Sequence, residues 1–221
     1  MNYDRIYDYR FKDIRQDQRQ RVWMEIAAFI ESKLNYPTTL LDAAAGRCEF
    51  INASAASEKW AVEQSKQLRA FAADDIRVVQ SDIFQANLPK NHFNGIFVSN
   101  FLEHLRSPDD VAMFLEQMYD LLQTGGRIAV MGPNFKRCGS VYFDCADHVL
   151  ALTEISVAEH LYGAGFDILE VRRAFLPFSF RGLLPPSRHL TRLYLKCPWA
   201  WPIFGKQFLV IGEKMTSAAE T

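Results

Sequence analysis

Two short apolar runs each end in residues that suit a nucleotide site. Residues 39–41 are followed by Asp42 and the small residues 43–46, and residues 60–62 are followed by Glu63, about 20 positions after Asp42. A turn without side chains lets backbone amides approach a ligand, and a carboxylate at the next strand end accepts both hydroxyl groups of a ribose. The pattern predicts a nucleotide pocket. The alternative is close packing of a helix on a strand, which also selects small residues.

A third acid follows another apolar run. Residues 76–81 lead into Asp82 and Ile83. A carboxylate there can accept a hydrogen bond from the exocyclic amine of a purine, and an isoleucine can form an apolar wall. The alternative role of Asp82 is to cap a turn. Because the carboxyl ends of parallel strands meet at one edge of a sheet, we expect Asp42, Glu63 and Asp82 to lie along the same edge.

Two histidines occupy positions that suit proton transfer. A base that activates a hydroxyl needs a pKa near neutrality, which an imidazole has. His148 is the preferred base, because Asp144 and Asp147 are near enough in sequence to orient its ring. His104, which follows the fourth expected strand, is the second candidate. Its alternative role is a helix-start residue bonded to the backbone.

The elements that must position these residues alternate strand with helix. Apolar runs predict strands over residues 38–43, 59–63, 76–81, 95–99, 127–131, 167–173 and 207–213. Apolar spacing and capping residues predict helices over residues 17–34, 49–56, 65–73, 108–123 and 153–162. Ser65, Ser107 and Thr153 are expected to cap three of these helices, and Gly125 and Gly126 to stop helix 108–123. This order predicts an α/β fold with a doubly wound, mostly parallel sheet.

The length of 221 residues suits one domain, over residues 1–214. Residues 1–36 are expected to form an N-terminal helical cap, and residues 215–221 a flexible tail. The proline- and aromatic-rich segment 176–205, which carries Arg181, is interpreted as a lid or a packing insertion. A dimer contact and a membrane-surface patch are its alternatives.

Composition excludes several classes of protein. A formal net charge of −1 creates no global field that would attract nucleic acid. The four cysteines are scattered without a C-x-x-C pair, so no metal site is expected and reduced thiols in a cytoplasmic protein are favoured. No apolar run reaches membrane-spanning length and the N-terminus does not read as a signal peptide. The sequence leaves open whether the chain forms a homodimer.

The successive motifs resemble those of class I S-adenosylmethionine-dependent methyltransferases. They are residues 41–46, 62–63, 81–83, 93–100, 103–105 and 121–127. The Asp147-His148 pair followed by residues 152–154 resembles a subgroup found with saccharide and natural-product biosynthesis. The resemblance covers about residues 38–214 and implies a seven-stranded, Rossmann-like sheet with an antiparallel last strand, and S-adenosyl-L-methionine as cofactor.

The resemblance also implies roles for single residues. The expected cofactor residues are Asp42, Ala43, Ala44 and Gly46 for the methionyl part, Glu63 for the ribose, Gln64, Asp82 and Ile83 for the adenine, Asn100 beneath the sulfonium, and Arg10 for the carboxylate. The chain departs from the family where glycine is usual but Ala44 and Cys48 stand. Each added side chain narrows the approach and removes easy access to a positive φ.

We therefore expect a methyltransferase that acts on oxygen of a small-molecule or saccharide-like acceptor. N-methylation of a small metabolite is the alternative within enzymes. A binding protein that has kept the fold but lost turnover is the alternative from another class, because of Ala44 and Cys48. A nicotinamide dehydrogenase is weakened by the absence of G-x-G-x-x-G.

Overall fold

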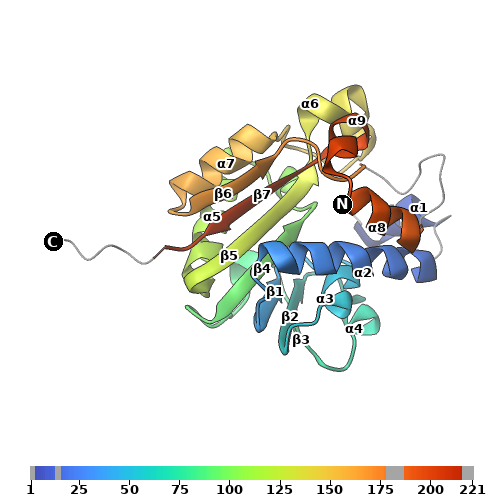
Figure 1. Ribbon diagram of the computed structural model, residues 1–221. Coiled ribbons are helices and arrows are strands. Elements are labelled where there is room, and N and C mark those ends of the chain that lie inside the picture. The colour runs from blue at the N-terminus through green and yellow to red at the C-terminus, as the bar shows by residue number, and fades with distance from the viewer. Residues whose placement is uncertain (1–2, 13–15, 178–186, 216–221) are drawn as a thin grey trace.

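The computed structural model describes residues 3–12, 16–177 and 187–215, and within them seven strands form one sheet (Figure 1). The strands are β1 (Thr39–Asp42), β2 (Glu58–Glu63), β3 (Ile76–Gln80), β4 (Phe93–Ser99), β5 (Leu122–Pro133), β6 (Asp167–Arg172) and β7 (Gln207–Glu213). Their order is β3-β2-β1-β4-β5-β7-β6. Strands β1 to β5 pair in parallel, and β7 is antiparallel to both of its neighbours. The predicted fold class is confirmed.

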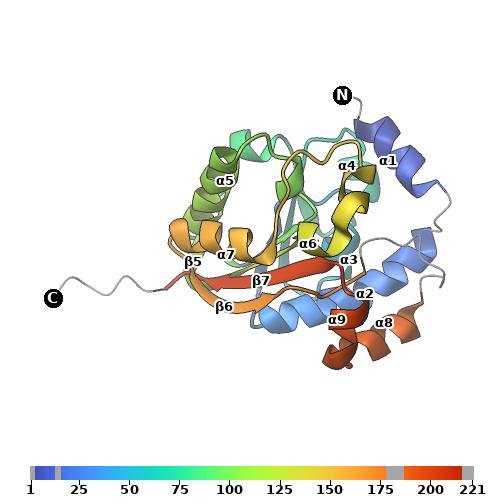
Figure 2. The same ribbon diagram turned by 90° about the horizontal axis from the view of Figure 1, so that it is seen from above.

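Helices cover both faces of the sheet (Figures 1 and 2). One face carries α2 (Gln16–Lys33), α3 (Glu49–Ala53), α4 (Leu68–Phe71), α8 (Arg188–Leu195) and α9 (Trp201–Phe204); the other carries α5 (Pro108–Leu121) and α7 (Glu154–Gly163). Successive strand residues serve opposite faces: Leu40 packs in the core below α2, and Leu41 packs in the core below α5. Both are fully buried, as expected of a central parallel strand.

Two helix starts lie where the sequence predicts them. The Ser107 hydroxyl accepts from the Asp110 N–H, and Pro108 occupies the first turn of α5. Thr153 caps α7 through a capping box with Ser156. These confirmed predictions share a local cause, because a cap needs only the next three residues to form.

Other local predictions are wrong. The helix expected over residues 65–73 is only α4, and Ser65 does not cap it, because its hydroxyl accepts from the Gln67 N–H in the turn before the helix. Gly125 does not stop α5, which ends at Leu121 and passes directly into β5. Gly125 instead bends β5 at a φ of +77°, and its N–H donates to the Lys214 carbonyl.

The described part of segment 176–205 is a packing element. The guanidinium groups of Arg188 and Arg192 both bind the Glu25 carboxylate of α2, and Trp201 packs edge-on against Phe29. This supports the packing interpretation for residues 187–205. Residues 178–186, with Arg181, lie outside the described residues, as do residues 216–221 of the predicted tail.

The N-terminal cap holds one helix that the sequence reading did not find. Helix α1 (Tyr3–Phe11) precedes α2, and its Asp8 pairs with Arg47 in the turn after β1. Its position is set by two ion pairs to distant loops, Asp8 with Arg47 and Arg10 with Asp147. Across the described residues, no helix is both long and apolar enough to span a bilayer.

Candidate active site at the carboxyl edge of the sheet

The site lies where the strand order changes direction. From β1 the chain moves outward to β2 and β3, and then returns to β4 on the other side of β1. In such open sheets the crevice for a ligand forms at the carboxyl ends of the two strands that flank this switch. The predicted residues after β1, β2, β3 and β4 therefore share one edge.

Backbone bonds from both neighbouring strands fix the turn after β1. The Ala43 N–H donates to the Phe97 carbonyl of β4 (3.1 Å), and the Ala45 N–H donates to the Val62 carbonyl of β2 (3.0 Å). Gly46 follows with a φ of +52°, and a Cβ atom built on it would meet nothing within 4 Å. The turn is rigid on its strand side and open on its outer side, as a cradle for a ligand must be.

Glu63 closes the other side of this cradle. Its Oε2 accepts from the Gly46 N–H (3.0 Å), and its Oε1 accepts from the Ser65 N–H (3.1 Å). The acid after β2 and the small-residue turn after β1 are thus brought together, as the spacing predicts.

Asp42 is a buried acid of the site with a strongly raised pKa. It is 3% exposed, and burial first, then the Glu63 and Glu49 carboxylates, raise the pKa of Asp42 to about 8. Three carboxyl groups thus converge on the turn, although Glu49 is also bound by Arg19. A cationic ligand would favour ionisation of these carboxyl groups, so the turn suits positive charge.

Asp82 and Ile83 lie just after β3, as the sequence predicts, and Asp82 also caps the turn that follows. The Asp82 Oδ1 accepts from the Phe84 N–H (2.9 Å) and caps the turn Ile83–Gln85. Ile83 is buried, and Gln64 is exposed. The cap uses only Oδ1 of Asp82, so Oδ2 can still accept a hydrogen bond from the amine of an adenine.

Positive φ angles mark two further positions of the site. Asn100 has a φ of +50°, its N–H donates to the Met131 carbonyl, and its Nδ2 donates to the Ser99 hydroxyl (2.8 Å). Cys48 has a φ of +58° where the family usually has glycine. Its side chain packs in the core below α2, and burial raises the pKa of this thiol to about 12. The Cys48 side chain is therefore part of the core, while Ala44 is half-buried in the turn.

His104 and His148 form a pair, and Asp147 lies near both rings. The His104 Nδ1–H donates to the Asp147 backbone carbonyl (2.8 Å) and lies 3.6 Å from Oδ2 of the same residue. Asp144 is exposed. The Asp147 backbone carbonyl thus orients His104. The Asp147 carboxylate also lies near His148, where it acts to raise the pKa of that ring, so the prediction that Asp147 orients His148 stays a prediction.

His148 lies deeper than a typical base. Its side chain is 3% exposed, between the rings of Tyr142 (centroids 4.8 Å apart) and His104 (5.2 Å). Burial, with His104 acting in the same direction, lowers the pKa of His148 to about 4. The ring is neutral at pH 7, and a base this weak takes up a proton poorly.

Arg10 reaches this cluster from α1. Its guanidinium binds the Asp147 carboxylate, so in this structure it faces the histidine loop. Burial alone would raise the pKa of Asp147, but the hydrogen bond from Arg10 and the nearby His104 lower it below its usual value. The predicted role of Arg10 toward the cofactor carboxylate stays a prediction.

Sequence reasoning gave no role to Glu103, although it directly precedes His104. Glu103 is 1% exposed, and its backbone carbonyl accepts from the N–H groups of Val149 and Leu150. Its position just after β4, at the same sheet edge as the other predicted site residues, could have indicated a role in the site. Asn134, directly after β5, caps α6 (Phe135–Cys138) and donates to the Glu154 carboxylate.

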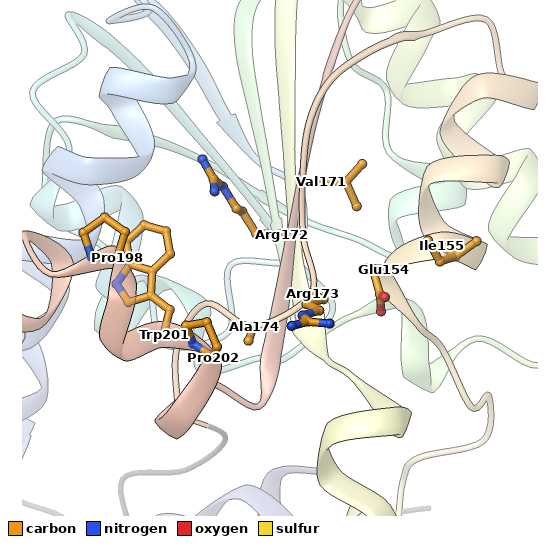
Figure 3. Close-up of a pocket in the computed structure, with 9 residues that line it drawn as sticks. All are labelled: Glu154, Ile155, Val171, Arg172, Arg173, Ala174, Pro198, Trp201 and Pro202. Carbon is orange, nitrogen blue, oxygen red and sulfur yellow. The ribbon is translucent and has the colours of Figure 1, made fainter.

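A separate hollow of about 390 Å³ opens beside β6 (Figure 3). Val171 and Ile155 line one side, and Arg172 faces Trp201 on the other. None of the predicted cofactor residues lines it.

Comparison with known proteins agrees with this geometry. Residues 37–130 match the family model of a methyltransferase domain. No curated protein matches the chain in sequence. A SAM-dependent methyltransferase from Archaeoglobus fulgidus is 18% identical with a TM-score of 0.69, over 96% of this chain and 100% of that one.

Two further solved structures have the same fold. The putative methyltransferase of Haloferax volcanii, in complex with the Trm112 methyltransferase activator, is 14% identical with a TM-score of 0.68, over 98% of this chain and 99% of that one. The N-methyltransferase NodS from Bradyrhizobium japonicum, in complex with S-adenosyl-L-homocysteine, is 13% identical with a TM-score of 0.62, over 93% and 91%.

The strand order, the turn after β1 and the acid after β2 define a class I methyltransferase fold, and the matched domain carries the same description. Residues 37–130 thus match a methyltransferase domain, and the chain has the fold of class I S-adenosylmethionine-dependent methyltransferases. The residues fit that cofactor, because Gly46 leaves open space beside the turn and converging carboxyl groups suit its positive charges.

Proposed function

We propose that the chain methylates a hydroxyl group of a small-molecule or saccharide-like acceptor. The cofactor supplies an electrophilic methyl carbon. The C–S bond breaks as the acceptor oxygen bonds to that carbon, S-adenosyl-L-homocysteine leaves, and the hydroxyl proton is released. The observation that carries the proposal is the His104–His148 pair, which stands in the loops after β4 and β5 at the cofactor edge.

The acidic turn supports this cofactor over a dinucleotide. Asp42 and Glu63 face each other across the turn, and the mutual repulsion helps to raise the pKa of Asp42. A pyrophosphate would bring two more negative charges to this place, whereas a sulfonium and an ammonium group bring positive ones. In this proposal Asp42 to Gly46 hold the methionyl part and Glu63 the ribose, with Asp82 and Ile83 at the adenine.

Helix α1 supports an acceptor of small size. Its ion pairs with Arg47, in the cofactor turn, and with Asp147, in the histidine loop, hold it over both parts of the site. A small molecule can enter beside a short helix, whereas a folded macromolecule would have to displace it.

N-methylation is a second candidate, and one observation favours it. The lowered pKa of His148 makes this ring a weak base, and transfer to a neutral amine needs no strong base. The solved structure of NodS, described as an N-methyltransferase, has the same fold.

The test uses S-adenosyl-L-methionine with a labelled methyl group and panels of hydroxylated and amine-bearing acceptors. The proposal predicts label in an ether product, and loss of turnover in His104→Gln with unchanged binding of S-adenosyl-L-homocysteine. Label only in amine products would replace it with the second candidate. Binding of the homocysteine product without turnover on any acceptor would favour a non-catalytic binding protein.

A further inference from the structure

Glu103 presents a buried side-chain oxygen without a hydrogen-bond partner. Within the part of the chain that the structure describes, its Oε1 is shielded from solvent and makes no hydrogen bond. Burying a polar oxygen without a hydrogen bond is unfavourable, so such atoms are rare unless a ligand completes them. A positively charged ligand would supply the missing interaction.

Two imidazole rings stand beside this oxygen. The His148 Nε2 lies 4.0 Å from Glu103 Oε1, too far for a hydrogen bond. Glu103, His104 and His148 each offer one donor atom, and these atoms lie within 4.8 Å of one another. Ligands about 2.1 Å from a common ion lie about 3–4 Å apart, so a shift of about 1 Å would complete the set.

The surroundings of His104 are those of a ligating histidine. Its Nδ1–H donates to the Asp147 carbonyl, which leaves the lone pair of the neutral ring on Nε2. Metal-bound histidines commonly donate their other ring N–H to a backbone carbonyl or a carboxylate, which fixes the tautomer and the ring orientation.

We propose that Glu103, His104 and His148 bind a divalent first-row transition cation. Two imidazoles and one carboxylate on one side of an ion leave its other positions open, as in catalytic zinc and iron sites. The sequence expectation of no metal rested on the scattered cysteines, and the proposed set uses none of them.

The position of the cation suggests its use, and this step rests on the proposed methyltransferase function. Glu103 and His104 follow β4 at the cofactor edge, close in sequence to Asn100. An acceptor hydroxyl on an open position of the ion would lose its proton more easily, because the cation stabilises the alkoxide. The histidines would then act on the acceptor through the ion.

A second set of donors shares His148. Cys145, Asp147 and His148 also offer donor atoms within 4.8 Å, but the Asp147 carboxylate is bound by Arg10. The Glu103 set is favoured because it contains the oxygen that lacks a partner.

The test is titration of the full chain with Co²⁺ alone, followed by visible absorption, in the absence of methyl donor. We expect saturable d–d bands for one ion per chain. His104→Gln, His148→Gln and Glu103→Gln should each weaken binding by about 10-fold or more, while His189→Gln, at an exposed histidine on α8, should leave it unchanged. Circular dichroism of each variant reports folding, and the part-exposed His104 is the variant expected to fold without loss.

Three outcomes would overturn the cation site: no saturable binding, equal binding by folded His104→Gln, or a thiolate-to-cobalt charge-transfer band that disappears in Cys145→Ser. This readout needs no turnover. Cobalt binding in a chain that transfers no methyl group would therefore refute the proposed function and leave the site intact, and methyl transfer by a chain that binds no cobalt would do the reverse.

Discussion

At the residue scale, the acidic side chains around the turn after β1 determine which ligand this edge of the sheet can bind. Asp42 and Glu63 come from different strands, and their spacing in sequence predicts that they meet. The sequence could not predict the depth at which Asp42 is buried, or that Glu63 would bond to Gly46, because both depend on how β2 and β4 flank β1. The surroundings of Glu103 could not be predicted either, because the N–H groups that donate to its backbone carbonyl come from a loop more than forty positions away.

Glu63 is predicted to bind the ribose. Glu63→Gln keeps the size of the side chain and removes its charge and one acceptor. We expect affinity for S-adenosyl-L-homocysteine to fall by about 1–3 kcal/mol, measured by calorimetry. Asp120→Asn, an exposed change on α5, is the matched control. Unchanged affinity in folded Glu63→Gln would remove Glu63 from the site.

Asp42 is predicted to make the unliganded protein less stable as the pH rises. The pKa of Asp42 is about 8 in the fold against the usual value of 3.8, so the unfolded chain loses this proton first as the pH rises. The stabilisation is complete below about pH 4 and is lost as the pH rises to about 8, with a slope of at most about 1.4 kcal/mol per pH unit.

Chemical denaturation at several pH values checks this dependence. The free energy of unfolding of the natural chain, minus that of Asp42→Asn, should decline across that range. Parallel curves for the two proteins would show that Asp42 ionises normally in the fold.

At the element scale, short loops between strands and helices carry the site, and their backbone angles are what the sequence reveals least. Caps such as Ser107 are visible in the sequence because their partners are three residues away. The length of α4 and the bend at Gly125 depend on contacts with other parts of the chain. Cys48 shows that a residue other than glycine can occupy a left-handed position when its side chain is packed in the core.

Gly46 is predicted to matter for its φ angle rather than for space. Gly46→Ala places a Cβ in an open region but at a φ of +52°, so we expect a loss of about 1–2 kcal/mol in unfolding free energy. Gly163→Ala, at the end of α7, also meets nothing within 4 Å, and its φ is not positive. It should be neutral or stabilising by up to about 1 kcal/mol. Equal effects at both positions in thermal and chemical unfolding would contradict the role of φ.

At the scale of the whole molecule, the N-terminal helix connects the two halves of the site. The strand order was predictable because alternating strands and helices allow few topologies. The position of α1 was not, because charged residues with little apolar periodicity hold it, through pairs with loops far along the chain. The packing of α8 on α2 was likewise one of several interpretations until Glu25 was seen between Arg188 and Arg192.

The pair between Arg10 and Asp147 is predicted to be the stronger attachment of α1. Its carboxylate is buried, whereas Asp8 in the pair with Arg47 is exposed. Arg10→Gln should speed amide hydrogen exchange in α1 by about 5- to 10-fold, and Asp8→Asn should have a smaller effect. Exchange in α5 should stay the same in both variants. A larger effect of Asp8→Asn would reverse the assignment.

The most direct test of the account is a crystal structure of the chain with S-adenosyl-L-homocysteine. The account predicts the ligand at the carboxyl ends of β1 and β2, with its ribose hydroxyls on Glu63 and its amino-acid part against the turn that ends at Gly46. A ligand bound elsewhere, such as the hollow beside Trp201, or one that leaves Glu63 bonded only to the backbone, would contradict the account.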